Sequence, residues 1–592
     1  MIKYLLTAAI FLTIPFLYFS QDKTNNSLTD EGVSYGGMLL YDEQDKDSYE
    51  EYIGFEGKRI KEVHIKILDV AGASVQEGVE RDTSWLGHIG NMFHYKTREW
   101  VIRNNLLFSA GDTLNADKLS ESERLLRLSG FFLDARIRII DFDNNKDSVS
   151  VEVITQDRWT LTFLLSYDTK NKDSYVGLRD DNLLGLGHIL DATLTHDENK
   201  SVGWGTTIRY NAMNVGGSFI NIGAILETNR SHDMKNISFT RPFLTTELDW
   251  MGGLSLTAEN GLYEYLNTGG SIVSIPYKLK MHDVWIGKSY EPWFGSNVFR
   301  QKTRFITSVR LAGLNHTERP FVEQDSNRIF QNNTQYLFSL GIINQRFYKE
   351  TYLGGFGITE DIPVGGYVVL TGGVEEREFD KRWYYGFESV YSTRIKGAGY
   401  FSGKFGIGGF RNMDKWEQNA IAADVLYHSP LIIDGKWKYR LLAESDLIYG
   451  FNRFQGEQIY LDNENGMRGF NTFSLFGTKK LTFNTEAFIF SPYEPLGFVI
   501  GGLIFADMGL IARRNEKLLT SRLYQAYGIG FRINNESIAR ANFEVSLVYN
   551  PYVPGSTPVR NDIKILFTGS FILGSRHFTF DRPSIINFNG AR

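Results

Sequence analysis

The chain has 592 residues, no cysteine and a formal net charge of −6. The lack of cysteine excludes disulfides, thiolate metal sites, a thiol nucleophile and a lipoprotein anchor, and the charge gives no reason to expect a nucleic-acid partner. Aromatic residues make up 14%, Gly outnumbers Pro by 58 to 13, and no long apolar run follows the N-terminus. This length and composition favour one large membrane β-barrel, with or without further domains, over a helical membrane protein.

The N-terminus predicts export. Lys3 precedes an apolar run at 4–19, and polar residues follow Ser20 directly. This pattern predicts a secretory signal peptide at 1–20, with an uncleaved anchor helix as the alternative. Residues 21–57 are polar and acidic without periodicity, which predicts a flexible periplasmic tether. Export together with a barrel-like body points to the outer membrane of a Gram-negative cell.

A small α/β domain is expected at 58–157, because the periodicity there alternates between strand and helix patterns. In chain order, the expected elements are a strand at 63–67, a helix capped by Thr97, a second helix from Asn115 to Gly130, and strands at 137–139 and 149–153. The order is therefore β-α-α-β-β.

One acidic stretch in this domain imitates a calcium-binding loop. Its acidic and amide residues fall at the first, third, fifth, seventh and twelfth positions of such a loop: Asp141, Asp143, Asn145, Asp147 and Glu152. Lys146 stands where the loop needs a glycine, and strands rather than helices are expected on both sides. A solvated hairpin turn is the preferred interpretation, and no metal is expected.

Residues 158–580 form a succession of alternating stretches separated by Gly, Asn and Asp turns, as in an antiparallel transmembrane β-barrel. About twenty candidate strands can be counted. A turn pattern occurs twice, as Asn182-Leu183-Leu184-Gly185 and as Asn214-Val215-Gly216-Gly217, both where a strand is expected to turn on the periplasmic side. A C-terminal tail at 581–592 follows the barrel.

The most informative motifs lie near the end of the chain. Arg468-Gly469-Phe470 is expected in a loop, and Phe505-x-Asp507-x-Gly509 lies on a later candidate strand. Between them, the alternation at 481–489 turns Glu486 toward the lumen. A loop folded into the barrel would bring Arg468 to both acids, and guanidinium with carboxylate is the pairing expected away from bulk water. The alternative is a surface turn and two ordinary lumen acids.

These motifs resemble the outer-membrane insertase superfamily, which contains BamA, TamA and the two-partner secretion transporters. Its members carry an Arg-Gly-Phe/Tyr loop inside the barrel, held by acids on neighbouring strands, one of them in a Phe-x-Asp-x-Gly motif. The expected domain at 58–157 is similar to a POTRA domain, although only one such unit fits where BamA-like proteins carry several. The resemblance implies sixteen strands, which conflicts with the pattern count.

The resemblance also implies a seam between the first and last strands that opens sideways. In this chain the first strand would carry Trp159 and Phe163, and the last would carry Phe567 and Gly569. A glycine in a strand removes a side chain and weakens local packing, which suits a seam. An ordinary strand glycine is equally compatible with the pattern.

Enzyme motifs are not found. The sequence has no Gly-x-Ser-x-Gly nucleophile elbow and no phosphate-binding Gly-Lys-Ser/Thr loop, and its ten His are scattered. Neither catalysis nor a cofactor is expected. The resemblance implies outer-membrane protein insertion or polypeptide translocation. The partners would be unfolded outer-membrane or secreted client polypeptides, the lipid bilayer, and periplasmic or lipoprotein accessory subunits. A passive pore, a structural protein, and lipid or surface-polymer export remain alternatives.

Overall fold

The computed structural model describes residues 28–588, with breaks at 30–31, 36–37, 42–47, 76–78, 81–90, 93, 141–146, 169–172, 198–202, 229–231, 267–270, 294–301, 464–465, 471–473, 536, 539–541, 553–561, 570–579, 581 and 587. The predicted signal peptide and most of the acidic hairpin turn lie outside the described residues. In the described part of the chain, no helix has the length and apolar character needed to cross a membrane.

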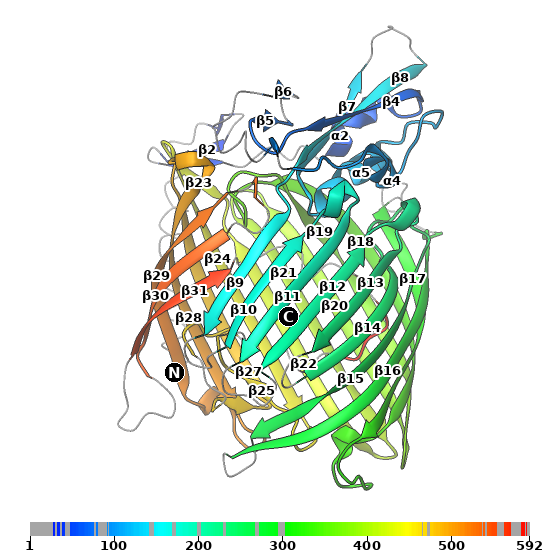
Figure 1. Ribbon diagram of the computed structural model, residues 1–592, viewed down its shortest axis with the longest axis vertical. Coiled ribbons are helices and arrows are strands. Elements are labelled where there is room, and N and C mark those ends of the chain that lie inside the picture. The colour runs from blue at the N-terminus through cyan, green and yellow to red at the C-terminus, as the bar shows by residue number, and fades with distance from the viewer. Residues whose placement is uncertain are drawn as a thin grey trace.

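A large antiparallel β-barrel forms most of the molecule (Figure 1). Its sheet has 24 strands, of which β1–β3 and the short β23 (Leu431–Asp434) are additions at one end, and the remaining twenty form the wall. The wall strands are β9 Leu161–Asp168, β10 Asp173–Asp180, β11 His188–Asp197, β12 Trp204–Ala212, β13 Asn221–Thr228, β14 His232–Arg241, β15 Trp250–Leu266, β16 Ile272–Tyr290, β17 Thr303–Glu318, β18 Asn333–Glu350, β19 Glu360–Arg377, β20 Lys381–Ile395, β21 Gly399–Asn412, β22 Lys415–His428, β24 Trp437–Phe451, β27 Lys479–Phe490, β28 Val499–Ala512, β29 Leu523–Asn534, β30 Asn542–Asn550 and β31 Asp562–Gly569.

The predicted fold class is confirmed, and the pattern count of about twenty strands is correct. The sixteen strands implied by the resemblance are wrong for this chain. All twenty wall strands belong to one sheet, and the long strands β15 to β19 pair with their sequence neighbours.

Side-chain exposure alternates along the wall strands as expected for a barrel in lipid. In β20, Trp383 and Tyr385 are 56% and 51% exposed, whereas Tyr384 between them is fully buried. In β16, Val284 and Ile286 face outward on either side of the buried Trp285. Apolar side chains therefore cover the outer face, where lipid would solvate them. Chain segments in the lumen cover part of the inward face.

A three-stranded sheet with two helices forms the small domain. Strand β8 (Ser148–Asp157) is central and pairs in parallel with β4 (Arg59–Leu68) and antiparallel with β7 (Phe132–Ile140). Helices α4 (Glu99–Asn104) and α5 (Ala116–Leu128) lie between this sheet and the barrel (Figure 1).

The helix ends follow from their local sequence, with one exception. The Asn115 side chain accepts a hydrogen bond from the Lys118 N–H and caps α5, and Gly130 takes φ +81° just beyond its end. The prediction that Thr97 caps the first helix is wrong, since Arg98 is the N-cap residue. Thr97 is instead buried, and its N–H donates to Asp157 Oδ2 at 2.7 Å.

The small domain begins ahead of Lys58. Helix α2 (Ser48–Tyr52) and the 3-10 turn η1 (Ile53–Phe55) precede β4, and Tyr52 is a buried part of the domain core. Part of the segment expected to be a flexible tether therefore packs onto the domain. Three short strands lie farther upstream, and the third of them pairs with β23: β1 Leu28–Thr29, β2 Gly32–Tyr35 and β3 Met38–Tyr41. A further small hairpin joins β5 (Ala73–Ser74) and β6 (Val79–Glu80).

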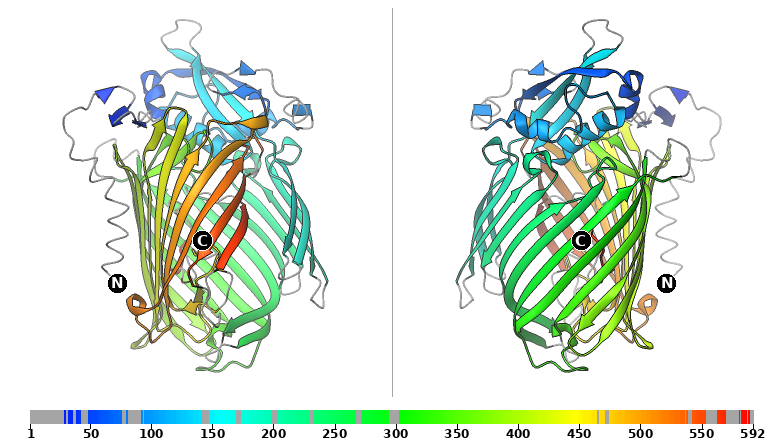
Figure 2. Two further views of the ribbon diagram at one scale, coloured as in Figure 1. Left: turned by 90° about the vertical axis from the view of Figure 1, so that its left-hand side faces the viewer. Right: turned by 90° about the vertical axis from the view of Figure 1, so that its right-hand side faces the viewer.

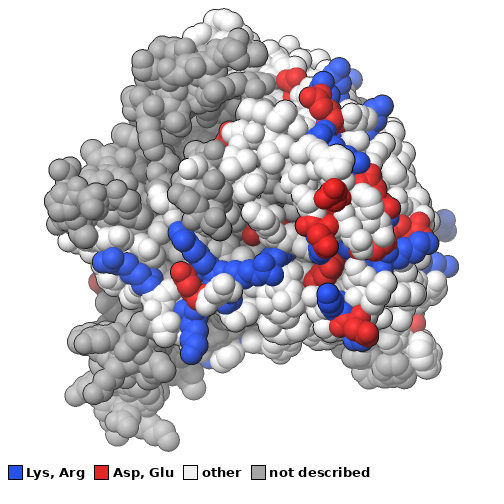
Figure 3. Space-filling view, turned by 90° about the horizontal axis from the view of Figure 1, so that it is seen from below, with Lys and Arg blue, Asp and Glu red and all other residues white. Residues whose placement is uncertain are grey.

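The small domain covers one end of the barrel (Figure 2). The chain enters the barrel at this end, and two short turns between strands lie against the domain. At the opposite end, basic and acidic side chains lie next to one another (Figure 3).

Candidate functional site

The loop between β24 and β27 folds back into the barrel. Short strands β25 (Ile459–Tyr460) and β26 (Phe476–Gly477) pair within it. Met467 and Phe470 are buried among lumen-facing side chains, on either side of Arg468. Gly469 has φ +81°, and a Cβ there would lie 2.7 Å from Asn550 Oδ1, so the loop needs glycine next to the arginine.

Arg468 pairs with both acids that the sequence predicted. Its Nε and Nη2 donate to the two oxygens of Asp507 at 2.8 and 2.7 Å, and its Nη1 donates to Glu486 Oε2 at 2.6 Å. Its backbone N–H also donates to Asp507, at 3.1 Å. The guanidinium carbon lies 3.5 Å from the centroid of the Phe505 ring. We call Arg468, Glu486 and Asp507 the arginine latch.

The alternation of β28 explains the spacing of the Phe-x-Asp-x-Gly motif. Phe505, Asp507 and Gly509 all face the lumen, whereas Ile504 is 54% exposed on the outer face. A Cβ on Gly509 would lie 2.8 Å from Leu461 and 3.0 Å from Met467, so glycine leaves space for the loop. The motif thus supplies an aromatic face, a carboxylate and a gap on one surface of one strand.

The charged network extends beyond the residues that the sequence predicted. Arg532 of β29 lies 3.7 Å from Glu486 and 2.7 Å from Glu544 of β30. Asn484 donates to Gly466 O at 2.8 Å. These residues were missed because they belong to no motif. Their lumen-facing positions in alternating strands, and the direct register of Arg532 with Glu544, were the signals that could have found them.

The latch holds the loop rigidly against the wall. Asp507 is fully buried and Glu486 is 10% exposed, so both carboxylates depend on arginine partners. Together with Arg532 and Glu544, the latch links β27 to β30 through the lumen, immediately before the last strand. The described residues contain no group of three His, Asp or Glu side chains placed to hold a metal ion.

The predicted seam residues are not brought together. Strand β9 pairs with β10 and β31 pairs with β30, and among the described strands no register joins β31 directly to β9. Phe163 faces outward and is 80% exposed. Trp159 instead contacts the connection between β29 and β30, where its backbone N–H donates to the Ser537 carbonyl at 2.7 Å. Phe567 and Gly569 lie opposite Val545 and Phe543 of β30.

The repeated turn pattern is explained by docking of the small domain. In both turns the asparagine carboxamide oxygen accepts the backbone N–H five residues later, from Gly187 and from Phe219, at 2.7 Å. The same asparagines donate to the domain, Asn182 to Thr97 Oγ1 and Asn214 to Asn104 O, both at 2.8 Å. The repeat therefore marks two barrel turns that bind either end of α4.

An ionic cluster fastens α5 to the barrel rim. Arg127 donates to both oxygens of Asp361 at 2.8 and 2.6 Å. Glu123 pairs with Arg127 at 2.7 Å and with Lys349 of β18 at 2.6 Å. Burial alone would raise the pKa of Glu123, but the positive charges of Arg127 and Lys349 outweigh it and lower this pKa to about 2.

The same cluster covers the outer edge of β7. Glu123 accepts the N–H of Ile137 at 2.9 Å, and the Tyr52 hydroxyl donates to the Ile137 carbonyl at the same distance. Arg127 donates to the Ala135 carbonyl at 2.8 Å. These backbone groups are therefore satisfied by side chains and do not offer pairing to another strand. The other edge strand, β4, has its first residues bridged by the segment around Thr113.

Comparison with known proteins found similar solved structures. BamA from Haemophilus ducreyi lacking POTRA domains 1–3 aligns with a TM-score of 0.39 at 11% identity, over 86% of this chain and 84% of that chain. CdiB from Acinetobacter baumannii aligns with a TM-score of 0.42 at 11% identity, over 86% and 73%. CdiB from Escherichia coli aligns with a TM-score of 0.41 at 10% identity, over 86% and 90%. No protein-family model matches the chain, and no curated protein matches it.

Proposed function

We propose that this chain is an outer-membrane barrel that inserts or translocates other polypeptides. The observation that carries the proposal is the arginine latch, which fixes a loop inside the lumen and links β27 to β30. The latch thereby holds strands β27 to β30 together from inside the lumen. In the described residues, the end strands β9 and β31 each pair with one neighbouring strand. An end strand with a free edge presents backbone groups that an incoming strand can pair with.

In this proposal the small domain acts as a POTRA-like receptor in the periplasm. Its β7 edge is occupied by side chains of α2 and α5, so β4, which pairs with β8 on its other side, is the edge strand that a client would use. An extended client segment can add to such an edge by β-augmentation. The clients would be unfolded outer-membrane or secreted polypeptides, and accessory subunits would bind the same domain.

The test is depletion of this protein followed by quantitative proteomics of the outer membrane. A broad fall in barrel proteins would support general insertion, and loss of one secreted protein would support dedicated translocation. Complementation with Arg468→Ala should restore less of the lost protein than the wild type does. An unchanged proteome would contradict the proposal and favour a passive pore or structural protein. A defect in lipid or surface polymer alone would indicate export of that material.

A further inference from the structure

The described residues of the C-terminal segment, 580, 582–586 and 588, lie inside the barrel. Phe580 is 6% exposed and packs with inward-facing side chains of the wall. They include Phe243, which follows β14, and residues of β15 to β20, namely Met251, Trp285, Ile306, Tyr367 and Val390. Trp285 belongs to the lumen face, since its neighbours Val284 and Ile286 are 43% and 58% exposed outside. Phe580 is thus held in the lumen rather than in lipid.

Polar contacts fix the direction of the segment. Arg582 pairs with Asp283 of β16, and the Pro583 carbonyl accepts Arg310 Nη1 at 2.9 Å. The Ile586 N–H donates to the hydroxyl of the buried Tyr384 at 2.8 Å. The segment therefore follows the inner wall from β16 to β20, and none of its described residues belongs to a strand.

Glycines of the wall leave space for its apolar side chains. A Cβ on Gly406 would lie 3.0 Å from Ile586 Cδ1, and a Cβ on Gly450 would lie 2.2 Å from the Phe588 ring. The guanidinium of Arg453 stacks 3.9 Å from the centroid of the same ring. Glycine at these wall positions therefore leaves room for the segment, because a larger side chain there would clash with it.

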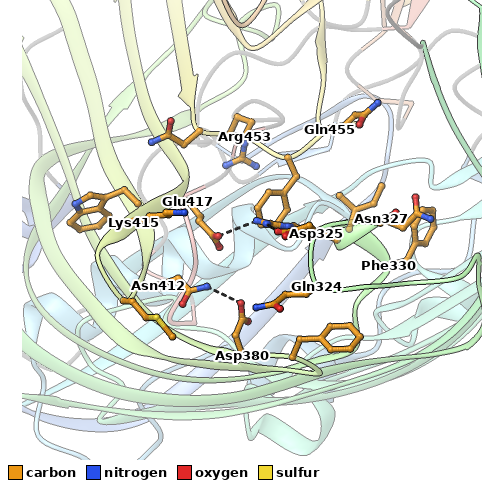
Figure 4. Close-up of a pocket in the computed structure, with 18 of the residues that line it drawn as sticks. Gln324, Asp325, Asn327, Phe330, Asp380, Asn412, Lys415, Glu417, Arg453 and Gln455 are labelled. Atoms are coloured by element: carbon orange, nitrogen blue, oxygen red, sulfur yellow. Dashed lines mark hydrogen bonds and ion pairs between the residues drawn. The ribbon is translucent and has the colours of Figure 1, made fainter.

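The segment borders the remaining space in the lumen. Ile585, Ile586 and Phe588 line a cavity of about 770 Å³ together with Arg382, Arg453 and other residues. A second cavity of about 1320 Å³ lies next to it, lined by the loops of the far end (Figure 4). There Glu417 pairs with Arg328 at 3.1 Å and with Arg382 at 3.2 Å. Without the segment, the first cavity would widen along the wall from β16 to β24.

We propose that the C-terminal segment, through its described residues 580, 582–586 and 588, is a displaceable internal plug that closes the lumen to ions and small solutes. The wall strands pair with one another and not with the plug, so the plug can leave without breaking the barrel. Its hold depends on apolar side chains in glycine-lined sites and on the contacts of Arg582, Pro583 and Ile586. This proposal does not depend on which polypeptide the barrel handles, because conductance of the purified protein tests it.

The test is single-channel conductance in planar bilayers. Deletion of 580–592 should raise conductance several-fold. In the full-length chain, Phe580→Asp with Ile586→Asp should do the same, since both side chains are buried in apolar clusters and an unpaired charge is costly to bury in an apolar site. Ser584→Asp is the matched control, because it adds the same charge at an exposed plug residue, and it should conduct like the wild type. A heat-modifiable gel shift verifies that each barrel is folded.

A disulfide lock separates plug displacement from damage to the wall. The chain has no natural cysteine, so Gly406→Cys with Ile586→Cys can be added to Phe580→Asp without background. The oxidised protein should return to wild-type conductance and reduction should raise conductance again. The proposal is overturned if folded deletion and double-Asp variants conduct like the wild type, or if Ser584→Asp conducts as much as they do. If the deletion does not fold, the full-length variants and the lock decide.

Discussion

Arg127 of helix α5 and Asp361 of strand β19 form a bidentate ion pair between the small domain and the barrel, although they are 234 residues apart in sequence. The Arg127 side chain is 6% exposed and that of Asp361 is 15% exposed. Because Arg127 also pairs with Glu123, which reaches Lys349, one cluster holds both the domain core and its attachment to the rim. The orientation of the domain over the lumen is therefore set by buried charges.

Removal of Asp361's charge should loosen the domain from the barrel. Asp361→Asn leaves Arg127 with a weaker partner at the interface, and breaking a buried pair costs about 3–5 kcal/mol at most. Limited proteolysis should then cut the connection after Asp157 several-fold faster. Arg103→Ala is the control, since its pair with Glu99 is about half exposed and such pairs contribute about 0–1 kcal/mol. Equal cleavage rates for both variants would contradict the role of the cluster.

Domain stability should fall in acid because of Glu123. Its pKa is lowered to about 2 in the folded state from an ordinary 4.5, so its stabilising contribution is present above about 4.5. That contribution is lost as pH falls through about 2. Burial raises the pKa of the nearby Asp134, and this shift acts in the opposite direction.

Thermal unfolding of the wild type and of Glu123→Gln, followed between pH 5 and pH 2.5, checks this expectation. The wild type should lose stability over this range, and the variant should start lower and change less. Glu121→Gln on the same helix should keep the wild-type slope, because Glu121 pairs with Arg124 and not with the cluster around Arg127. If the stabilities of the wild type and Glu123→Gln changed equally with pH, Glu123 would not be the cause of the acid sensitivity.

Loss of the latch arginine should destabilise the barrel loop. Arg468→Ala leaves the buried Asp507 and Glu486 without this cation, at a cost of about 3–5 kcal/mol, and the temperature of the heat-modifiable gel shift should fall. Arg468→Lys should recover part of the lost transition temperature, because lysine keeps the charge but not the bidentate geometry. Arg319→Ala removes a bidentate pair with Glu378 near the barrel end and should have a smaller effect. An equal fall for Arg319→Ala would argue against the latch.

Cross-linking β9 to β31 should lower activity if the seam opens. Phe163→Cys with Phe567→Cys allows a flexible, reducible thiol cross-linker to join the two end strands, which no described register pairs directly. Leu165→Cys with Val176→Cys is the control, because these residues are direct partners in β9 and β10. Only the first pair should reduce outer-membrane protein assembly, and reduction or omission of the cross-linker should restore it. Full activity with the seam pair cross-linked would show that the barrel works without opening there.

The sequence by itself determined the barrel and the membership of the latch. A strand places every second residue on one face, so Glu486 and Asp507 had to face the lumen once the outer face was apolar. The Arg468 loop could then be matched to them by charge alone. Asn115 and Gly130 likewise determined the ends of α5, because caps act within a few residues.

Only the tertiary structure decided which residues the inward-facing side chains pack against. Alternation does not reveal that Trp285 and Phe580 belong to one buried cluster, or that Glu123 pairs with Lys349, since these residues lie hundreds of positions apart. Thr97 was read as a cap because its local sequence fits one, yet the buried carboxylate of Asp157 takes its N–H. Sequence patterns, which act over a short range, therefore identified the wall and its motifs, and the folded barrel determined what packs inside it and against its rim.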